Sequence, residues 1–237
     1  MDSDKRGLEI YLRPTTAIDS EHEMVRRVAV ELTSPLPDDP AKARALFYFV
    51  RDWIHYNVYM ISTRFEDFVA STVLARRKGY CVQKAVLLAA LARVASIPSR
   101  LIFARIKNHK APWELIAQTG LDVFPSHGYT QLFLGGKWIN VTPAFDRELC
   151  EKSGVPAVEF DGIHDASLAA NDLSGNPYIE YIEKYEPQAD LPFEWLRGKV
   201  VPIWGEKSAW LTLEESKGHR MPSGYVFPET DTGINLP

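Results

Sequence analysis

Apolar residues in the first third of the chain recur at the spacing of helices. A first helix is expected to follow a cap at Asp19 or Ser20 and to continue through Leu32, with acidic residues in its first turn. A second helix is expected from Asp39, read as its N-cap, to about Tyr56. The pattern therefore predicts a helical N-terminal region.

The most apolar stretch of the chain begins at Cys81, and its apolar residues would surround a helix almost completely. Such a helix is expected to be central and buried, and Pro98 would end it. Alternating residues over Ser99–Ile106 then predict a strand, and residues 113–118 a short helical excursion.

Two alternating runs on either side of Gly135-Gly136 predict a β-hairpin with a two-residue turn. The facing pairs that follow from this turn are Leu134/Lys137, Phe133/Trp138, Gln131/Asn140, Tyr129/Thr142 and His127/Ala144. Because alternate residues share a face, His127 and Thr142 are expected on one face as diagonal neighbours. Such neighbours are about 7–8 Å apart at the backbone, a distance that side chains bridge.

The last third of the chain is rich in Pro, Gly, Asp and aromatic residues and gives a weaker pattern. A short helix is expected over residues 145–152, and residues 178–182 are expected to be ordered. We expect one compact domain, with a core and its N-terminal helices over residues 1–150 and a C-terminal extension over 151–237 that wraps the core.

Composition excludes several classes of protein. The chain has 237 residues, 46% of them apolar and 24% charged, which is enough to bury a large core. Its 27 basic and 31 acidic residues are mixed, so no nucleic-acid partner is expected. The sequence has neither the apolar run of a secretory signal nor that of a membrane span, so a cytoplasmic location without membrane contact is expected.

The two cysteines, Cys81 and Cys150, are too few for a disulfide framework and do not stand in metal-ligand spacing with the six histidines. No glycine-rich phosphate loop is present. No metal or cofactor is therefore expected, and each cysteine has to be interpreted on its own.

Cys81 has the sequence setting of a nucleophile. A thiol attacks as the thiolate, and the unpaired N–H groups and dipole at the start of a helix favour negative charge there. The same N–H groups can stabilise an oxyanion on an attacked carbonyl. A cysteine that opens a buried helix, then a strand, then His127 opening a hairpin is the layout of papain-like enzymes.

These segments resemble a known family. The run Ser71–Cys81 and the residues after it as far as Arg100 resemble the nucleophile region of the transglutaminase-like superfamily. The run His127–Pro143 resembles its histidine and acid strands, and Phe49–Tyr56 resembles the helix that usually precedes them. The resemblance covers residues 40–146.

The resemblance implies a papain-like α+β fold with N-terminal helices, a buried central helix and an antiparallel sheet. It implies that Cys81 is the nucleophile and His127 its general base. Thr142 stands where the superfamily usually has an aspartate. Its hydroxyl could orient the imidazole, but it cannot stabilise an imidazolium as a carboxylate would. Gln83 and Trp53 are candidates to help bind an oxyanion or the substrate.

Other residues could supply the third catalytic group. Asn140 faces Gln131, which lies four residues along the strand from His127. At the rise of a strand this is about 13 Å, too far for the Asn140 side chain to contact the imidazole. Asp146 follows the strand directly and is favoured, with a capping role before the short helix as the alternative. Asp161 or Asp165 would have to return from the extension.

The predicted chemistry is acyl transfer at an amide through a thioester acyl-enzyme. A peptidase or amidase acting on a peptide or protein is expected, since no calcium-loop signature is present. Two alternatives stay open: a transglutaminase that passes an acyl group from glutamine to an amine, and a catalytically silent scaffold, which the threonine at position 142 suggests. The sequence does not identify the substrate or the oligomeric state.

Overall fold

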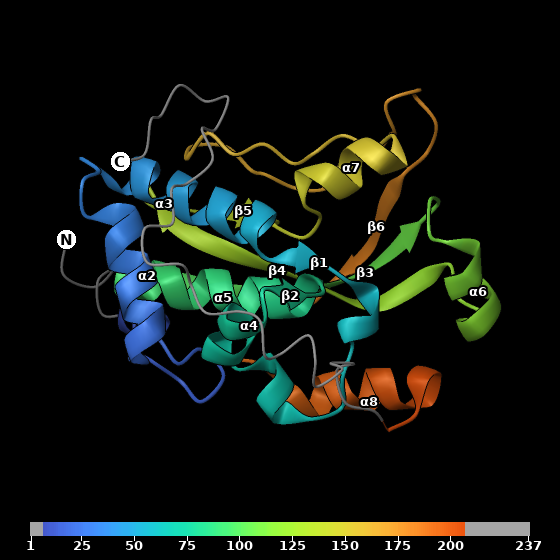
Figure 1. The fold of residues 1–237 in the computed structure, drawn as a ribbon, viewed down its shortest axis with the longest axis horizontal. Coiled ribbons are helices and arrows are strands. Elements are labelled where there is room, and N and C mark those ends of the chain that lie inside the picture. The colour runs from blue at the N-terminus through green and yellow to red at the C-terminus, as the bar shows by residue number, and fades with distance from the viewer. Residues whose placement is uncertain (1–6, 207–237) are drawn as a thin grey trace.

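The computed structural model describes residues 7–206, and at its centre helix α5 (Cys81–Val94) lies between N-terminal helices and an antiparallel sheet (Figure 1). Almost every side chain of α5 is buried, because apolar residues surround the helix on all sides. Helices combined with an antiparallel sheet confirm the predicted α+β class, and the buried central helix beside the sheet has the arrangement expected of a papain-like fold. Residues 1–6 of the predicted core region and 207–237 of the predicted C-terminal extension lie outside the described residues.

The remaining helical elements lie around α5 and the sheet (Figure 1). The longer ones are α2 (Glu23–Thr33), α3 (Asp39–Tyr48), α4 (Ala70–Arg76), α6 (Trp113–Thr119), α7 (Arg147–Ser153) and α8 (Phe193–Trp204). The short ones are η1 (Glu9–Tyr11), η2 (Phe49–Trp53), η3 (Val58–Met60) and η4 (Phe65–Phe68). Within residues 7–206 no helix has the length and apolar character to cross a membrane.

Two helix starts differ from the prediction by a few residues. His22 caps α2, where its Nδ1 accepts the Met24 N–H at 3.3 Å, and the Asp19 carboxylate instead accepts the Ser71 N–H at 3.0 Å. Asp38, not the next residue, caps α3. Both expected caps were wrong because long-range partners and neighbouring side chains compete for the same backbone groups.

The sheet contains four antiparallel strands in the order β5-β4-β3-β6. They are β3 (Ser99–Asn108), β4 (Val123–Leu134), β5 (Lys137–Val141) and β6 (Ile179–Lys184). The hairpin register is confirmed at Leu134/Lys137, Phe133/Trp138 and Gln131/Asn140. A separate parallel pair, β1 (His55–Tyr56) and β2 (Lys78–Gly79), joins the end of the N-terminal helices to the turn before α5.

The strands on both sides of β3 carry a register shift at the same level. Between Ala104 and Ile106, β4 has one extra residue ahead of His127, and β6 has one extra residue after Tyr181. Such bulges bend a strand and redirect the side chains beside them.

Residues beyond 150 contribute to both the sheet and its cover. Strand β6 pairs with β3 and forms the edge of the sheet (Figure 1). Helix α8, which the sequence pattern did not predict, packs Phe193 against Phe65 and Phe68, and Trp195 against Phe103.

Candidate active site

Cys81 is the first residue of α5, and backbone N–H groups lie near its sulfur. The preceding turn is fixed because Gln83 Oε1 accepts the Tyr80 N–H at 3.0 Å. The N–H groups of Gly128, Val82 and Cys81 itself lie near enough to the sulfur to act on the pKa of the thiol, which they lower. Two of these donors are unpaired groups of the first helical turn, and the third comes from β4.

Strand β4 approaches the start of α5 closely at Gly128. A Cβ at this position would lie 2.8 Å from Cγ2 and 3.0 Å from Cα of Val82. One turn further along the helix, the Thr130 hydroxyl donates to the Ala85 carbonyl at 2.9 Å. The absence of a side chain at Gly128 therefore brings its neighbour His127 to the N-terminus of the helix.

His127 lies in β4 with only 3% of its surface exposed. Its ring stacks on Tyr129 with centroids 6.0 Å apart, and among the described residues its buried Nε2 has no hydrogen-bond partner. Burial lowers the pKa of the imidazole to about 4. The ring is therefore neutral at pH 7 and able to accept a proton.

Burial also sets the resting charge of Cys81. It raises the pKa of the thiol to about 11, although the N–H groups of Gly128 and Val82 and the nearby Lys84 act in the opposite direction. The sequence argument considered the N–H groups of the helix start but neither the Gly128 N–H nor the stronger effect of burial. The resting pair is accordingly a thiol and a neutral imidazole.

Cys81 and His127 line one pocket, of about 380 Å³. Its walls include residues of η3, α6, the start of β4, α7 and α8, so segments far apart in the sequence form it. The walls are mainly apolar and include Val58, Ile61, Leu115, Phe124, Val155 and Ile203. Two lysines lie among them: Lys110 forms an ion pair with Asp172 at 2.7 Å, and Lys199 lies on α8.

Residues 26–143 match the family described as the transglutaminase-like superfamily. The chain belongs to the transglutaminase-like superfamily. The matched segment contains α5, the hairpin and Thr142, and so includes the residues that carried the sequence resemblance. No curated protein matches the sequence.

Two solved structures resemble this transglutaminase-like chain. One, a "Putative Cysteine Protease" from Cytophaga hutchinsonii, is 17% identical with a TM-score of 0.46, and the match covers 79% of this chain and 55% of that one. The other, a "putative protease" from Parabacteroides distasonis, is 16% identical with a TM-score of 0.38, covering 57% of this chain and 25% of that one. This chain thus spans about half and a quarter of their respective lengths.

At the third position, Thr142 is completely buried directly after β5. Its N–H donates to the Ala166 carbonyl at 2.8 Å, while its hydroxyl has no hydrogen-bond partner among the described residues. The position that usually holds an aspartate in the superfamily therefore presents an uncharged, unpaired hydroxyl.

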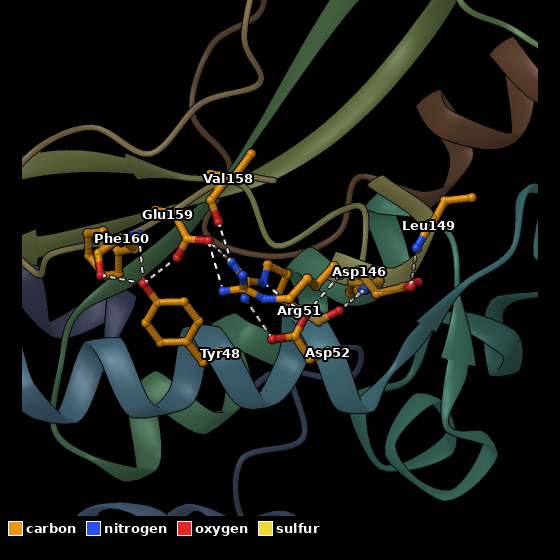
Figure 2. Close-up of polar contacts among 10 residues, drawn as sticks. Tyr48, Arg51, Asp52, Asp146, Leu149, Val158, Glu159 and Phe160 are labelled. Carbon is orange, nitrogen blue, oxygen red and sulfur yellow. Dashed lines mark hydrogen bonds and ion pairs between the residues drawn. The ribbon is translucent and has the colours of Figure 1, made fainter. Parts of the chain in front are cut away.

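The Asp146 carboxylate accepts from backbone groups, and among the described residues no hydrogen bond joins it to His127. One of its carboxylate oxygens caps α7 by accepting the Leu149 N–H at 3.0 Å (Figure 2), and the other accepts the Tyr56 N–H at 2.8 Å. Asp146 does not line the pocket. Asp146 therefore has the capping role that was the alternative prediction. Its carboxylate also links β1 to the start of α7.

The other polar candidates also have different partners. Asp165 binds the backbone and side-chain N–H groups of Asn140 at 2.8 and 2.7 Å, and Asn140 in turn accepts from Gln131. Asp161 pairs with His164 at 2.6 Å. No hydrogen bond within residues 7–206 joins any of these groups to His127.

Gln83 and Trp53 also lie away from the pocket. Gln83 is completely buried, and its amide donates to the carbonyls of Met60 and Asp67 at 3.1 and 2.8 Å. Trp53 stacks on Phe49 and lies beneath the Arg77 guanidinium. Gln83 thus anchors the loops before α5, and the oxyanion donors that remain close to the sulfur are backbone groups.

Sequence reasoning missed the residue from β6 that approaches His127. Tyr181 has its ring centroid 6.0 Å from that of His127, in an edge-on arrangement. The sequence predicts ordered structure over residues 178–182, but nothing in the sequence pattern indicates that these residues pair with β3. Within the described residues, no group of three or more His, Cys, Asp or Glu side chains could hold a metal ion.

Proposed function

We propose that the chain is a cysteine-nucleophile enzyme that cleaves amide bonds, as a peptidase or amidase. The observation that supports it most is the pocket that Cys81 and His127 line together, with the sulfur at the start of α5 and close to the N–H group of Gly128. Superfamily membership supports the same chemistry. The expected cytoplasmic location is not needed for this proposal.

In the proposed reaction, His127 takes the proton of the Cys81 thiol as sulfur attacks the carbonyl carbon. The negative charge that develops on the carbonyl oxygen is stabilised by backbone N–H groups at the start of α5. The C–N bond breaks, His127 returns the proton to the leaving amine, and a thioester remains on Cys81. Water then hydrolyses the thioester and releases the acid.

The pocket favours an apolar acyl group. Its walls are mainly aliphatic and aromatic, so a substrate side chain such as leucine would bury apolar surface beside the nucleophile. Lys199 on α8 adds a positive charge to the same lining, which suits a substrate carboxylate further from the cleaved bond.

A panel of fluorogenic peptide amides tests this function. We expect cleavage after leucine to be at least roughly tenfold faster than after glutamate, since one apolar contact discriminates by about that factor. Cys81→Ser should abolish turnover, and Cys150→Ser, which removes a buried thiol outside the pocket, should retain it. No cleavage of any peptide by folded wild-type protein would count against the proposal.

Two other functions are separated by the same experiment. If a dansylated primary amine is incorporated into product in place of water, the enzyme is a transglutaminase. If wild-type protein forms no thioester on Cys81, detected by intact mass, the silent scaffold is favoured. The uncharged Thr142 is the observation that motivates this last alternative.

A further inference from the structure

Three buried polar atoms without hydrogen-bond partners belong to residues that are neighbours in the structure. Within residues 7–206 the uncharged side chains with such an atom are those of Tyr80, His127, Thr142 and Tyr181. An unpaired polar atom in a protein interior costs about 1–3 kcal/mol, so neighbouring ones are expected to serve each other. His127, Thr142 and Tyr181 form such a cluster of neighbours.

Ring contacts connect the aromatic members of this cluster. The Tyr181 ring lies edge-on to His127 with centroids 6.0 Å apart, at an interplanar angle of 68°. Tyr129 completes a triangle, 6.0 Å from His127 and 6.3 Å from Tyr181. Tyr181 therefore packs directly against the imidazole, although one strand separates their backbones.

The Tyr181 hydroxyl is close to Thr142. Burial raises the pKa of Tyr181 to about 12, while the Leu168 N–H and the Thr142 hydroxyl act to lower it. Neither hydroxyl meets the geometry of a full hydrogen bond in the described residues, so the two are neighbours and not a bonded pair. Cys81 also lies near enough to affect Tyr181 electrostatically.

The strand irregularities lie at the same place. The extra residue in β4 stands just ahead of His127, and that in β6 just after Tyr181. Between them β3 places Ala104 opposite His127, a small side chain that leaves room for the tyrosine ring. Two bulges at one level of a sheet indicate that both side chains are directed there by the backbone.

We propose that Tyr181 is a positioning residue for His127, and that its hydroxyl together with that of Thr142 takes the place of the superfamily's aspartate. The Nε2–H of His127 would donate to this hydroxyl pair. That hydrogen bond holds the proton on Nε2 and leaves Nδ1 as the base for the Cys81 thiol. The catalytic part of this inference rests on the proposed function, but the tautomer of His127 does not.

Two neutral hydroxyls differ from a carboxylate in what they stabilise. They fix the orientation and tautomer of the ring but give little stabilisation to an imidazolium. The enzyme would therefore depend on correct placement of a neutral base.

NMR of the full chain with ¹⁵N-labelled histidine tests the positioning directly. We expect the His127 signals, assigned with His127→Gln, to show the proton on Nε2, and Tyr181→Phe to shift the Nε2 signal or mix the tautomers. Tyr129→Phe is the matched control, because it also removes a hydroxyl from a ring packed on His127 but should leave the Nε2 signal in place. An unchanged Nε2 signal in Tyr181→Phe, or a proton on Nδ1 in the wild type, would overturn the inference.

Turnover gives a second measurement. Tyr181→Phe should lower kcat roughly tenfold with little change in KM, as expected for loss of one orienting hydrogen bond. Adding Thr142→Asp to that variant should restore kcat, because a carboxylate replaces the hydroxyl pair. If Tyr181→Phe does not fold, Thr142→Val is measured by the same NMR and turnover experiments. Absence of turnover in the wild type would refute the proposed function while the NMR result still decides the positioning role.

Discussion

At the scale of single residues, Cys81 is subject to two opposing influences on its pKa. Backbone N–H groups at the start of α5 favour the thiolate, whereas burial beneath the pocket walls disfavours it and is the larger effect. The positions of Cys81 and His127 could be predicted because the helix start and the hairpin are local patterns. Their resting charges could not, because segments far apart in the sequence form the pocket.

The buried imidazole gives a test in the pH dependence of stability. The pKa of His127 is about 4 in the folded chain, below its ordinary value of 6.5, so the unfolded chain binds more protons between these values. The free energy of unfolding should therefore fall as pH falls through this window, by about 2 kcal/mol at pH 5. Urea denaturation at pH 7.5 and 5.0 measures it.

The variants His127→Gln and His55→Gln provide the comparison. Removal of the buried imidazole should flatten the pH dependence, whereas the exposed His55 should leave it as in the wild type. Equal pH dependence in His127→Gln and wild type would show that the ring is not held neutral by burial.

At the scale of elements, the central helix and the hairpin followed their patterns, whereas the helix expected from Asp39 to about Tyr56 is divided into α3, η2 and the strand β1. The bounds of α5 and the register of the β4–β5 hairpin match the predictions, because a continuous apolar surface and a Gly-Gly turn specify them locally. Helix α8 and the bulges in β4 and β6 were missed. They depend on contacts with residues distant in sequence, as in the packing of Phe193 on Phe65.

The crossing of β4 and α5 at Gly128 can be tested by adding one methyl group. In Gly128→Ala the new Cβ would lie within 3.0 Å of Val82, including its Cα, so strand and helix must separate. We expect a loss of about 1–3 kcal/mol in the free energy of unfolding. Amide cleavage should be lost even where the protein remains folded, because His127 moves with the strand.

Gly198→Ala is the control for this substitution. Gly198 lies in α8, and a Cβ there meets no atom within 4 Å, so alanine should be neutral or stabilise the helix by up to about 1 kcal/mol. If both variants behaved alike, the close crossing would not be what positions His127.

At the scale of the whole molecule, the site depends on residues beyond the segment that carries the family resemblance. Strand β6 brings Tyr181 to His127, and α8 supplies Lys199 and Ile203 to the pocket. The family resemblance ended near residue 146. The sequence could therefore suggest Cys81 as nucleophile and His127 as base, but not the residues that form the pocket walls or the tyrosine that packs against His127. An irregular, proline-rich segment gives no periodic signal from which its packing could be predicted.

One side chain connects this later segment to the helical layer. Arg51, with 1% of its side chain exposed, donates to the Val158 carbonyl at 2.7 Å and to Glu159 at 3.0 Å, and also pairs with Asp52 (Figure 2). Its guanidinium lies 4.7 Å from the centre of the Tyr48 ring. Removing the buried Arg51 side chain would leave the buried Val158 carbonyl without this donor, while the partly exposed Asp52 and Glu159 carboxylates would remain accessible to water.

Arg51→Met should therefore lower the free energy of unfolding by about 2 kcal/mol. Arg147→Met offers a matched control, since Arg147 binds the same Glu159 carboxylate oxygen at 3.1 Å but is 41% exposed, and its loss should cost less than about 1 kcal/mol. Urea denaturation compares the two variants.

Limited proteolysis followed by mass spectrometry should show earlier cleavage near residues 158–160 in Arg51→Met only, because this variant alone loses the bond to the Val158 carbonyl. Equal stability of both variants would mean that the extension is held to the core by its apolar contacts, such as Phe47 with Phe160, and not by the buried arginine.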